Sequence, residues 1–338
     1  MAFDVTLIPG DGIGPEITTE TVKVLEATGL KFNWDEELAG MAAVDATGTP
    51  LPDATVESIR KNSLALKGPL TTPVGTGFRS VNVGLRKAFE LYANVRPAKS
   101  IVPGGRYENI DIVLVRENLE GLYVGVENFV QVGNDPRAVA QSMAIVTRLG
   151  CERIVRYAFE YAIRHGRKKV TIVHKANILK MASGLFLEVG RLVAAEYEGR
   201  VASNDMIIDN TAMQLVMRPE QFDVMVTTNM FGDILSDEIS GLVGGLGLAP
   251  GANIGTSAAI FEAVHGSAPD IAGKGVANPS AQMLAAAMLL DHVGEVERGN
   301  RIRSAVEDVI VRQNIRTRDL GGTAGTREYG DAVARRVG

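Results

Sequence analysis

The chain has 338 residues, which at about 150 residues per domain suggests about two domains with a substantial buried core. Hydrophobic residues make up 46% and charged residues 22%, a composition that excludes disordered and fibrous architectures. The 35 lysines and arginines stand against 40 aspartates and glutamates, giving a net charge of −5. We therefore expect no general binding to nucleic acid or to an anionic membrane.

The single cysteine, Cys151, excludes an intrachain disulfide and a zinc site made of thiolates from one chain. The N-terminus shows no basic segment followed by an apolar one, so we expect a cytoplasmic protein, with the mitochondrial matrix as the open alternative. An uncharged run of 23 residues, Ile239–Phe261, contains six glycines and Pro250. We expect loop and turn there rather than a membrane span.

In chain order, a strand is predicted at Val5–Ile8, a helix at Pro15–Ala27 and a second apolar segment near Phe32. Pro15 favours a helix start because proline lacks the amide hydrogen that the first helical turn leaves unpaired. Further strands are predicted at 110–115, 170–174, 206–208 and 224–227, and helices at 149–165, 180–197, 232–242, 280–293 and 296–313. This alternation is typical of an α/β fold.

Two segments rich in proline or glycine divide this pattern. Arg96–Gly105 is the best candidate in the chain for a first linker, and Gly244–Gly255 is the best candidate for a second. Two linkers in one chain indicate a middle domain inserted into an outer domain that both termini build. We expect residues 1–98 and 247–338 to form the large domain and residues 99–246 the small one.

A glycine-rich loop, Gly10–Pro15, lies between the first strand and the first helix, and Asp35 follows about 20 residues later. A dinucleotide fingerprint has similar parts, but its last glycine is replaced here by Pro15. We interpret the loop as a glycine turn, with a Rossmann phosphate site as the less favoured alternative.

Three arginines, Arg86, Arg96 and Arg116, each lie beside the end of a predicted element. A guanidinium group binds a carboxylate through two hydrogen bonds, so three arginines would suit a compact polycarboxylate. The alternative is that all three are surface arginines in ordinary ion pairs.

Asp233 and Asp237 are four residues apart, which places both carboxylates on one face of a helix. A divalent cation would relieve their repulsion, and oxygen ligands favour Mg²⁺ or Mn²⁺. The alternative is two solvated acids in an exposed first helical turn. Elsewhere, Lys175 and Tyr123 are possible proton carriers, and the small residues of His265–Gly273 would let a backbone approach a flat or phosphorylated ligand.

Taken together, five segments resemble the metal-dependent β-decarboxylating dehydrogenases, the family of isocitrate, homoisocitrate and 3-isopropylmalate dehydrogenases. The segments are LIPGDGIGPE (7–16), VRENLEGLY (115–123), HKAN (174–177), NMFGDILSD (229–237) and HGSAPDIAG (265–273). The resemblance implies a non-Rossmann α/β fold like that of isopropylmalate dehydrogenase, with a small domain inserted into a large cofactor-binding one. It also implies a homodimer whose interface lies in the small domain and whose active sites share residues between subunits.

The resemblance assigns roles residue by residue. Tyr123 and Lys175 would be catalytic, with Lys175 acting in the neighbouring subunit's site. Substrate binding is expected at Ser80, Asn82, Arg86, Arg96, Arg116, Tyr123, Lys175 and Asn177. Mg²⁺ or Mn²⁺ is expected at Asp233 and Asp237 with Asp209 of the partner subunit. The cofactor is expected at Leu70, Thr72, Asn82, Glu262, His265, Gly266, Ser267, Ala268, Asp270, Ile271 and Asn278.

The choice of substrate depends on Ser80 and Asn82, which offer a hydroxyl and an amide. Both can hydrogen-bond the third carboxylate of isocitrate, whereas an apolar substrate tail would leave them unpaired at a cost of about 1–3 kcal/mol. The stretch Ala93–Lys99 also resembles homoisocitrate dehydrogenases, so that activity and 3-isopropylmalate oxidation remain alternatives.

For the cofactor, Asp270 and Ile271 occupy positions where NADP-using relatives resemble Lys-Tyr. A carboxylate there would accept hydrogen bonds from the ribose hydroxyls and repel a 2′-phosphate, which favours NAD. The sequence thus predicts oxidative decarboxylation of isocitrate to 2-oxoglutarate with reduction of NAD. A non-enzymatic alternative is the regulatory subunit of a hetero-oligomeric isocitrate dehydrogenase.

Overall fold

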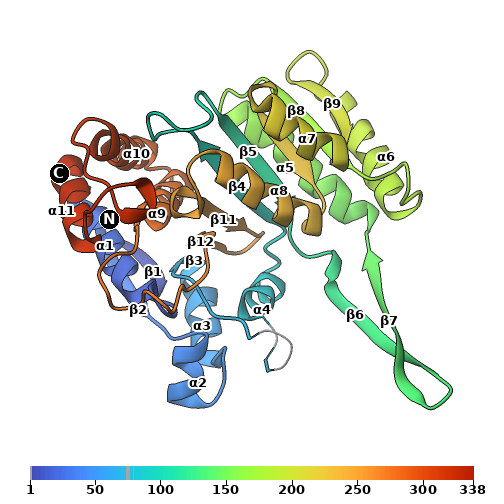
Figure 1. Cartoon of the computed structure of the whole chain (residues 1–338), viewed down its shortest axis with the longest axis horizontal. Coiled ribbons are helices and arrows are strands. Elements are labelled where there is room, and N and C mark those ends of the chain that lie inside the picture. Colours follow the sequence, from blue (N-terminus) through green and yellow to red (C-terminus); the bar gives the residue numbers. More distant parts are fainter. Residues whose placement is uncertain (1, 74–76, 79) are drawn as a thin grey trace. The chain divides into compact units, whose positions relative to one another are not determined.

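The computed structural model describes residues 2–73, 77, 78 and 80–338, which form two compact units (Figure 1). The first unit comprises residues 1–91, 96–110 and 240–338, and the second comprises residues 92–95 and 111–239. The second unit falls within the segment 92–239, while the predicted small domain covers 99–246. Residues 99–110 and 240–246 of the predicted small domain therefore group with the chain termini, and residues 92–95 of the predicted large domain group with the second unit.

The first unit contains a sheet with strand order β2-β1-β3-β12-β11, in which the β11–β12 pair is antiparallel and the other neighbours are parallel. The strands are β1 (Ala2–Ile8), β2 (Lys31–Glu36), β3 (Leu64–Lys67), β11 (Pro250–Ile254) and β12 (Ala259–Ala263). The helices are α1 (Gly14–Ala27), α2 (Met41–Thr47), α3 (Asp53–Asn62), α4 (Val81–Ala88), α9 (Ser280–His292), α10 (Val296–Val311) and α11 (Thr326–Val337). Short 3₁₀ turns occur at Leu246–Leu248 and Arg318–Leu320.

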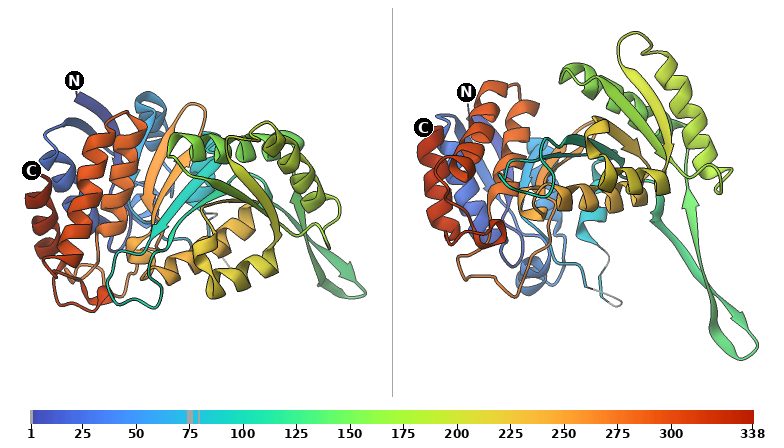
Figure 2. Two further views of the ribbon diagram at one scale, coloured as in Figure 1. Left: turned by 90° about the horizontal axis from the view of Figure 1, so that it is seen from above. Right: turned by 45° about the horizontal axis from the view of Figure 1, so that its top comes forward.

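Helix α9 is central to this unit, because its apolar side chains are buried on nearly all sides. It packs against β11 and β12 on one side and against α1 and α10 on the other. Figure 2 shows the blue α1 beside the red C-terminal helices, where α11 packs against both α1 and α10. The two ends of the chain thus build one core, as an inserted-domain fold requires.

The second unit contains a parallel sheet of order β5-β10-β8-β9. Its inner strands are almost wholly buried and rich in valine, as expected where helices cover both faces of a parallel sheet. The strands are β5 (Asp111–Glu117), β8 (Lys169–His174), β9 (Ala202–Ile207) and β10 (Val224–Thr227), and the helices are α5 (Arg148–Arg164), α6 (Ala182–Ala195) and α7 (Ile208–Met217). A 3₁₀ turn follows at Pro219–Gln221, and β4 (Ala93–Lys99) and α8 (Asn229–Leu242) contain residues of both units.

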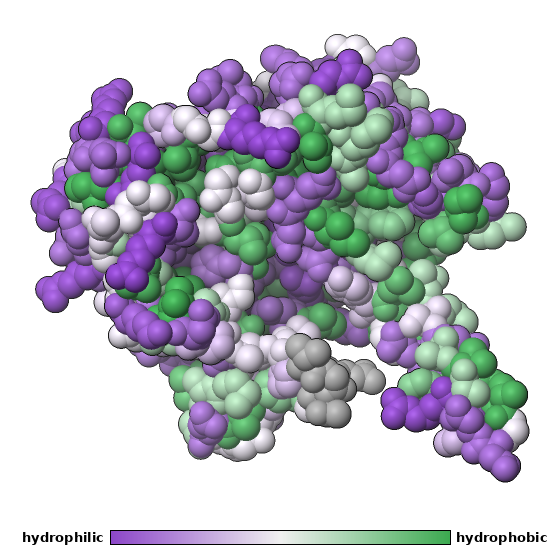
Figure 3. All heavy atoms as spheres, viewed as in Figure 1, coloured by the Kyte–Doolittle hydropathy of each residue, from purple (hydrophilic) through white to green (hydrophobic). Residues whose placement is uncertain are grey.

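A long antiparallel hairpin, β6 (Gly121–Val132) and β7 (Asp135–Ile145), forms a sheet of its own in the second unit (Figure 1). Most of its residues are exposed on both faces, including Phe129 at 50% and Met143 at 60%. Apolar surface is visible along it at the lower right of Figure 3. Since a two-stranded sheet is marginally stable alone in water, this hairpin needs a covering surface.

The predicted α/β fold and each predicted strand and helix are confirmed, with ends that shift by a few residues. Two segments that we expected to be irregular contain strands. The first predicted linker contains part of β4, and the uncharged run 239–261 contains β11 and most of β12 rather than loop alone. Within the described part of the chain, every helix is too short or too polar to cross a membrane.

Candidate active site

Arg116, at the end of β5, is the centre of a hydrogen-bonded cluster in the second unit. Its Nε and Nη2 donate to Asn229 Oδ1 at 3.0 and 2.8 Å, and its Nη1 donates to Asp233 Oδ1 at 2.5 Å. Tyr123 Oη donates to the other carboxylate oxygen of Asp233 at 2.8 Å. The structure therefore brings together three residues that the sequence predicted for substrate, metal and proton transfer.

The local sequence explains why this cluster forms. Asn229 and Asp233 are four residues apart on α8, so both side chains face β5 from the first turns of the helix. Gly232 lies between them, and a Cβ atom there would overlap the aliphatic part of Arg116. Arg116 is only 1% exposed, so its guanidinium needs partners within the protein, and Asn229 and Asp233 are two of them.

The two aspartates of α8 fit a hard divalent cation in their chemistry. Asp233 has a side chain that is 36% exposed, and Asp237 lies one turn further along the same helix and is exposed. The two carboxylate oxygens of Asp233 accept from Arg116 and from Tyr123 respectively. Among the residues that the structure describes, no three acidic, histidine or cysteine side chains group closely enough to hold a metal.

Lys175 follows β8 and forms an ion pair with Asp209 at the start of α7. Its backbone N–H donates to Ser183 Oγ at 2.7 Å, and the preceding His174 accepts a hydrogen bond from the Ala176 N–H at its Nδ1. These bonds fix the loop that carries Lys175. Asn177, the other predicted residue of this loop, is exposed.

In the first unit, three predicted substrate residues lie on α4 or directly before it. Ser80 precedes the helix, but its hydroxyl makes no capping bond to it. Asn82 Oδ1 and Arg86 Nε are both buried and have no hydrogen-bond partner among the described residues. Unpaired buried polar atoms are costly, and a ligand or a water that pairs with them would lower that cost. Arg96, on β4, is also buried, at 9% exposure.

Glu262, a predicted cofactor residue on β12, is held in a buried ion pair. Lys67 Nζ lies 2.6 Å from its Oε2, and Asn253 Nδ2 donates to its Oε1 at 2.7 Å. Burial alone would raise the pKa of Glu262, but the positive charges of Lys67 and Arg86 and these hydrogen bonds lower it to about 2. Glu262 is therefore a fixed negative charge at neutral pH.

The remaining predicted cofactor residues also lie in the first unit. Leu70 is buried and Thr72 is exposed, while Ser267 Oγ is 2.7 Å from Thr71 Oγ1. His265 Nδ1 lies 2.9 Å from the Gly266 carbonyl, and burial lowers the pKa of His265, so the ring is neutral at pH 7. The loop continues through Ala268, at a positive φ of 39°, to the exposed Asp270 and the partly buried Ile271.

Asn278, predicted at the adenine, uses its side chain within the protein. Its Nδ2 donates to Asp319 Oδ2 at 2.9 Å, and its Oδ1 accepts from the Ser280 N–H at 2.9 Å. Both bonds fix the start of α9.

Residues 4–333 match the family model described as isocitrate/isopropylmalate dehydrogenase. This chain belongs to that family. It is 50% identical to the isocitrate/homoisocitrate dehydrogenase of Thermus thermophilus, with 98% of each chain covered. It is 48% identical to a mitochondrial regulatory subunit of NAD isocitrate dehydrogenase from Dictyostelium discoideum, over 98% of this chain and 91% of that one. A solved isocitrate dehydrogenase from Methylococcus capsulatus is 58% identical, with a TM-score of 0.96 and 99% of each chain covered. The chain is thus a decarboxylating dehydrogenase of this family, and the expected fold is confirmed.

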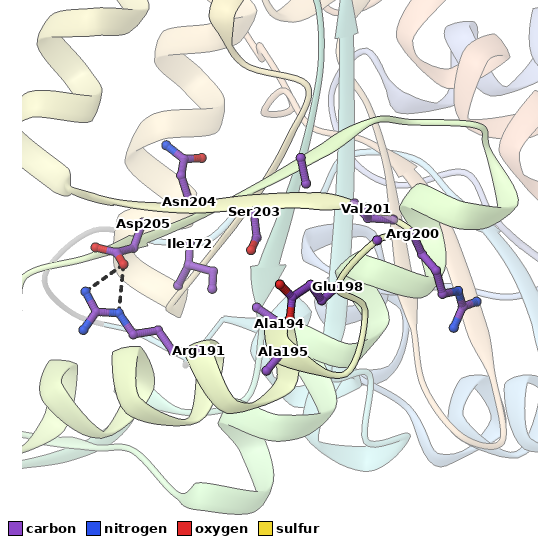
Figure 4. A pocket seen from close by; sticks show the side chains of 12 residues that line it. Ile172, Arg191, Ala194, Ala195, Glu198, Arg200, Val201, Ser203, Asn204 and Asp205 are labelled. Atoms are coloured by element: carbon purple, nitrogen blue, oxygen red, sulfur yellow. Dashed lines mark hydrogen bonds and ion pairs between the residues drawn. The ribbon is translucent and has the colours of Figure 1, made fainter.

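A separate pocket of about 660 Å³ lies between α6 and the edge strand β9 of this dehydrogenase (Figure 4). None of the predicted site residues lines it. Arg191 and Asp205, which line it, form an ion pair with Nη2 to Oδ1 at 2.8 Å.

Sequence reasoning about this dehydrogenase missed two residues that hold the predicted ones. Asn229 is the first residue of the NMFGDILSD segment, but the sequence pattern alone did not indicate that it binds Arg116. Lys67 ends the buried strand β3, and a lysine at the end of an apolar run was the available signal that it has a buried partner.

Proposed function

We propose that this chain catalyses the metal-dependent oxidative decarboxylation of isocitrate to 2-oxoglutarate, with NAD as the hydride acceptor. The observation that carries the proposal is the contact of Arg116 and Tyr123 with one carboxylate, that of Asp233. Three groups that the reaction needs are therefore close together. Arg116 can bind a substrate carboxylate, Asp233 is a carboxylate of the type that binds Mg²⁺, and Tyr123 is a phenolic proton donor.

The residues of α4 support a tricarboxylate as substrate. The unpaired Arg86 Nε and the uncapped hydroxyl of Ser80 can each donate a hydrogen bond, which a third carboxylate would accept and an alkyl tail would not. Asn82 offers its amide N–H₂ to a carboxylate, and Arg86 and Arg96 add positive charge. Among the relatives, this polar set favours isocitrate over 3-isopropylmalate.

Asp233 and Asp237, with Asp209 of the partner subunit, would hold Mg²⁺ or Mn²⁺. When bound, the cation supplies Lewis-acid polarisation of the oxygen at the carbon that is oxidised. Arg116 binds the carboxylate beside that carbon and is itself fixed by Asn229. The partner subunit's Lys175 accepts the hydroxyl proton, and the phenol of Tyr123 protonates the carbon that loses carbon dioxide. Asn177 assists in substrate binding.

The loop at 265–271 supports NAD as the cofactor. Asp270 is exposed, so its carboxylate is accessible to ribose hydroxyls and would repel a 2′-phosphate. Gly266, Ser267 and Ala268 are small residues close to Asp270 in the chain. The other proposed cofactor residues are Leu70, Thr72, Asn82, Glu262, His265, Ile271 and Asn278. The name of the Dictyostelium relative also specifies NAD.

A homodimer is part of this proposal. The β6–β7 hairpin exposes apolar side chains on both faces, and a second copy would cover them. Asp209 of each copy would complete the metal site of the other, and Lys175 of each copy would complete the other's catalytic residues.

The deciding experiment assays the purified chain with isocitrate, homoisocitrate, 3-isopropylmalate, malate and tartrate, each with NAD and with NADP. We expect Mg²⁺-dependent NADH formation from isocitrate, with kcat/KM several orders of magnitude above that for 3-isopropylmalate. Faster turnover of homoisocitrate would support the dual activity named for the Thermus relative. Absence of turnover with every pair, in a folded dimer, would instead support the regulatory role named for the Dictyostelium relative.

A further inference from the structure

The glycine-rich loop between β1 and α1 contacts two segments that are distant in the sequence. Gly10 and Gly12 have φ values of 84° and 60°, a backbone conformation that favours glycine. A Cβ atom on Gly10 would overlap the carbonyl of Pro69, and one on Gly12 would overlap the carbonyl of Ser267. The glycines therefore allow the loop backbone to contact two distant segments.

Asp11, within this loop, accepts hydrogen bonds from three backbone N–H groups. Its Oδ2 accepts from Thr71 at 2.8 Å and from Met41 at 3.1 Å, and its Oδ1 accepts from Ala42 at 3.0 Å. The residue is 7% exposed, so these bonds are made largely out of water. A carboxylate can accept hydrogen bonds at both of its oxygens. The side chain of asparagine has one oxygen and one N–H₂ group, so it would place a donor against one of these backbone N–H groups.

The same loop binds the segment before α9. The Asp11 N–H donates to the Pro69 carbonyl at 2.7 Å, and the Ile13 N–H donates to the Ser267 carbonyl at 2.9 Å. The hydroxyls of Thr71 and Ser267, 2.7 Å apart, close the connection between the two segments. Residues 69–72 and 265–268 are thus held together through Asp11 and its neighbours.

We propose that Asp11 is a positioning residue for the dinucleotide. The two segments that its loop joins carry Leu70, Thr72 and His265–Ala268, which the proposed function assigns to the cofactor, and the inference rests on that function. Asp11 itself is satisfied by backbone groups and serves by fixing where these segments present their atoms. The backbone hydrogen bonds of the glycine-rich loop join these two segments. This contact explains the glycines without the Rossmann phosphate site that was the alternative interpretation of the sequence.

The test compares Asp11→Asn with Asp45→Asn, which neutralises an exposed aspartate on α2, the helix whose start Asp11 binds. For Asp11→Asn we expect KM for NAD to rise at least tenfold while KM for isocitrate stays within twofold, and the Kd of NADH from fluorescence titration to rise in parallel. For Asp45→Asn we expect wild-type values. A variant that only loosened the fold would raise both Michaelis constants or lower kcat alone.

A milder variant, Thr71→Val, removes one hydroxyl of the connection and keeps Asp11. It should raise the Kd of NADH three- to tenfold, and it decides the question if Asp11→Asn does not fold. Unchanged NADH binding in a folded Asp11→Asn protein, or in Thr71→Val if that is the only folded variant, would overturn the inference. Wild-type protein that binds neither NADH nor NADPH would instead refute the proposed function.

Discussion

Replacing Lys67 by methionine is expected to destabilise the first unit strongly, because it leaves Glu262 charged, buried and without its nearest cation. Lys67 is 2% and Glu262 7% exposed, and the ion pair is 2.6 Å long. Loss of one partner of a buried pair costs about 3–5 kcal/mol. The pKa of Glu262 gives a consistent value, since a decrease from 4.5 to about 2, at 1.36 kcal/mol per unit, corresponds to about 3 kcal/mol.

The pH dependence has a definite sign. Glu262 has a folded-state pKa below its unfolded value, so it stabilises the protein above about pH 4.5, and this contribution is lost as the pH falls toward 2. Without Lys67, the pKa of Glu262 should lie above its wild-type value, because the effect of burial is then offset only by Arg86 and Asn253. The difference in unfolding free energy between wild type and Lys67→Met should therefore be larger at pH 7 than at pH 5.

Urea unfolding followed by tryptophan fluorescence measures this effect, because the only tryptophan, Trp34, lies on β2 of the first unit. The matched control is Lys99→Met, which breaks an exposed ion pair with Glu307 and should cost less than about 1 kcal/mol. The double variant Lys67→Met/Glu262→Gln should lose less unfolding free energy than the two single variants lose in sum, by at least about 2 kcal/mol. Additive effects, or equal losses for Lys67→Met and Lys99→Met, would refute the reasoning.

Four further outcomes follow from the site. Asn229→Ala should raise KM for isocitrate about 10- to 100-fold, because it removes the acceptor for two Arg116 donors, and an unchanged KM in steady-state assays would contradict that role. EDTA should abolish turnover and Mg²⁺ or Mn²⁺ should restore it, whereas full activity in chelator would exclude a metal requirement. Asp270→Lys should shift the ratio of kcat/KM for NAD over NADP toward NADP, and an unchanged ratio would show that this position does not select the nucleotide. Heterodimers of Lys175→Ala and Tyr123→Phe subunits should recover activity that neither homodimer has, and inactive verified heterodimers would count against shared sites.

Short-range patterns in the sequence were enough to predict much of the fold and part of the site. The four-residue spacing of Asp233 and Asp237 placed both on α8, and the end of an apolar strand located Arg116. These features depend on helical and strand periodicity, which the sequence expresses directly.

Long-range pairings could not be predicted in this way. Lys67 and Glu262 belong to strands far apart in the sequence, and only the pairing of β3 with β12 brings them together. The hairpin β6–β7 was also missed, because strands exposed on both faces lack the alternation that one buried face imposes. For Asp11, the three partners are backbone amides, which carry no identity in the sequence.

The exposed hairpin has a practical consequence for work with this enzyme. If a second copy covers it, the fraction of chains with an ordered hairpin depends on the monomer–dimer equilibrium. The apparent melting temperature then rises with protein concentration. Activity measured at nanomolar dilution would then decline with time as subunits dissociate, and would return on reconcentration after a lag set by the encounter of two chains.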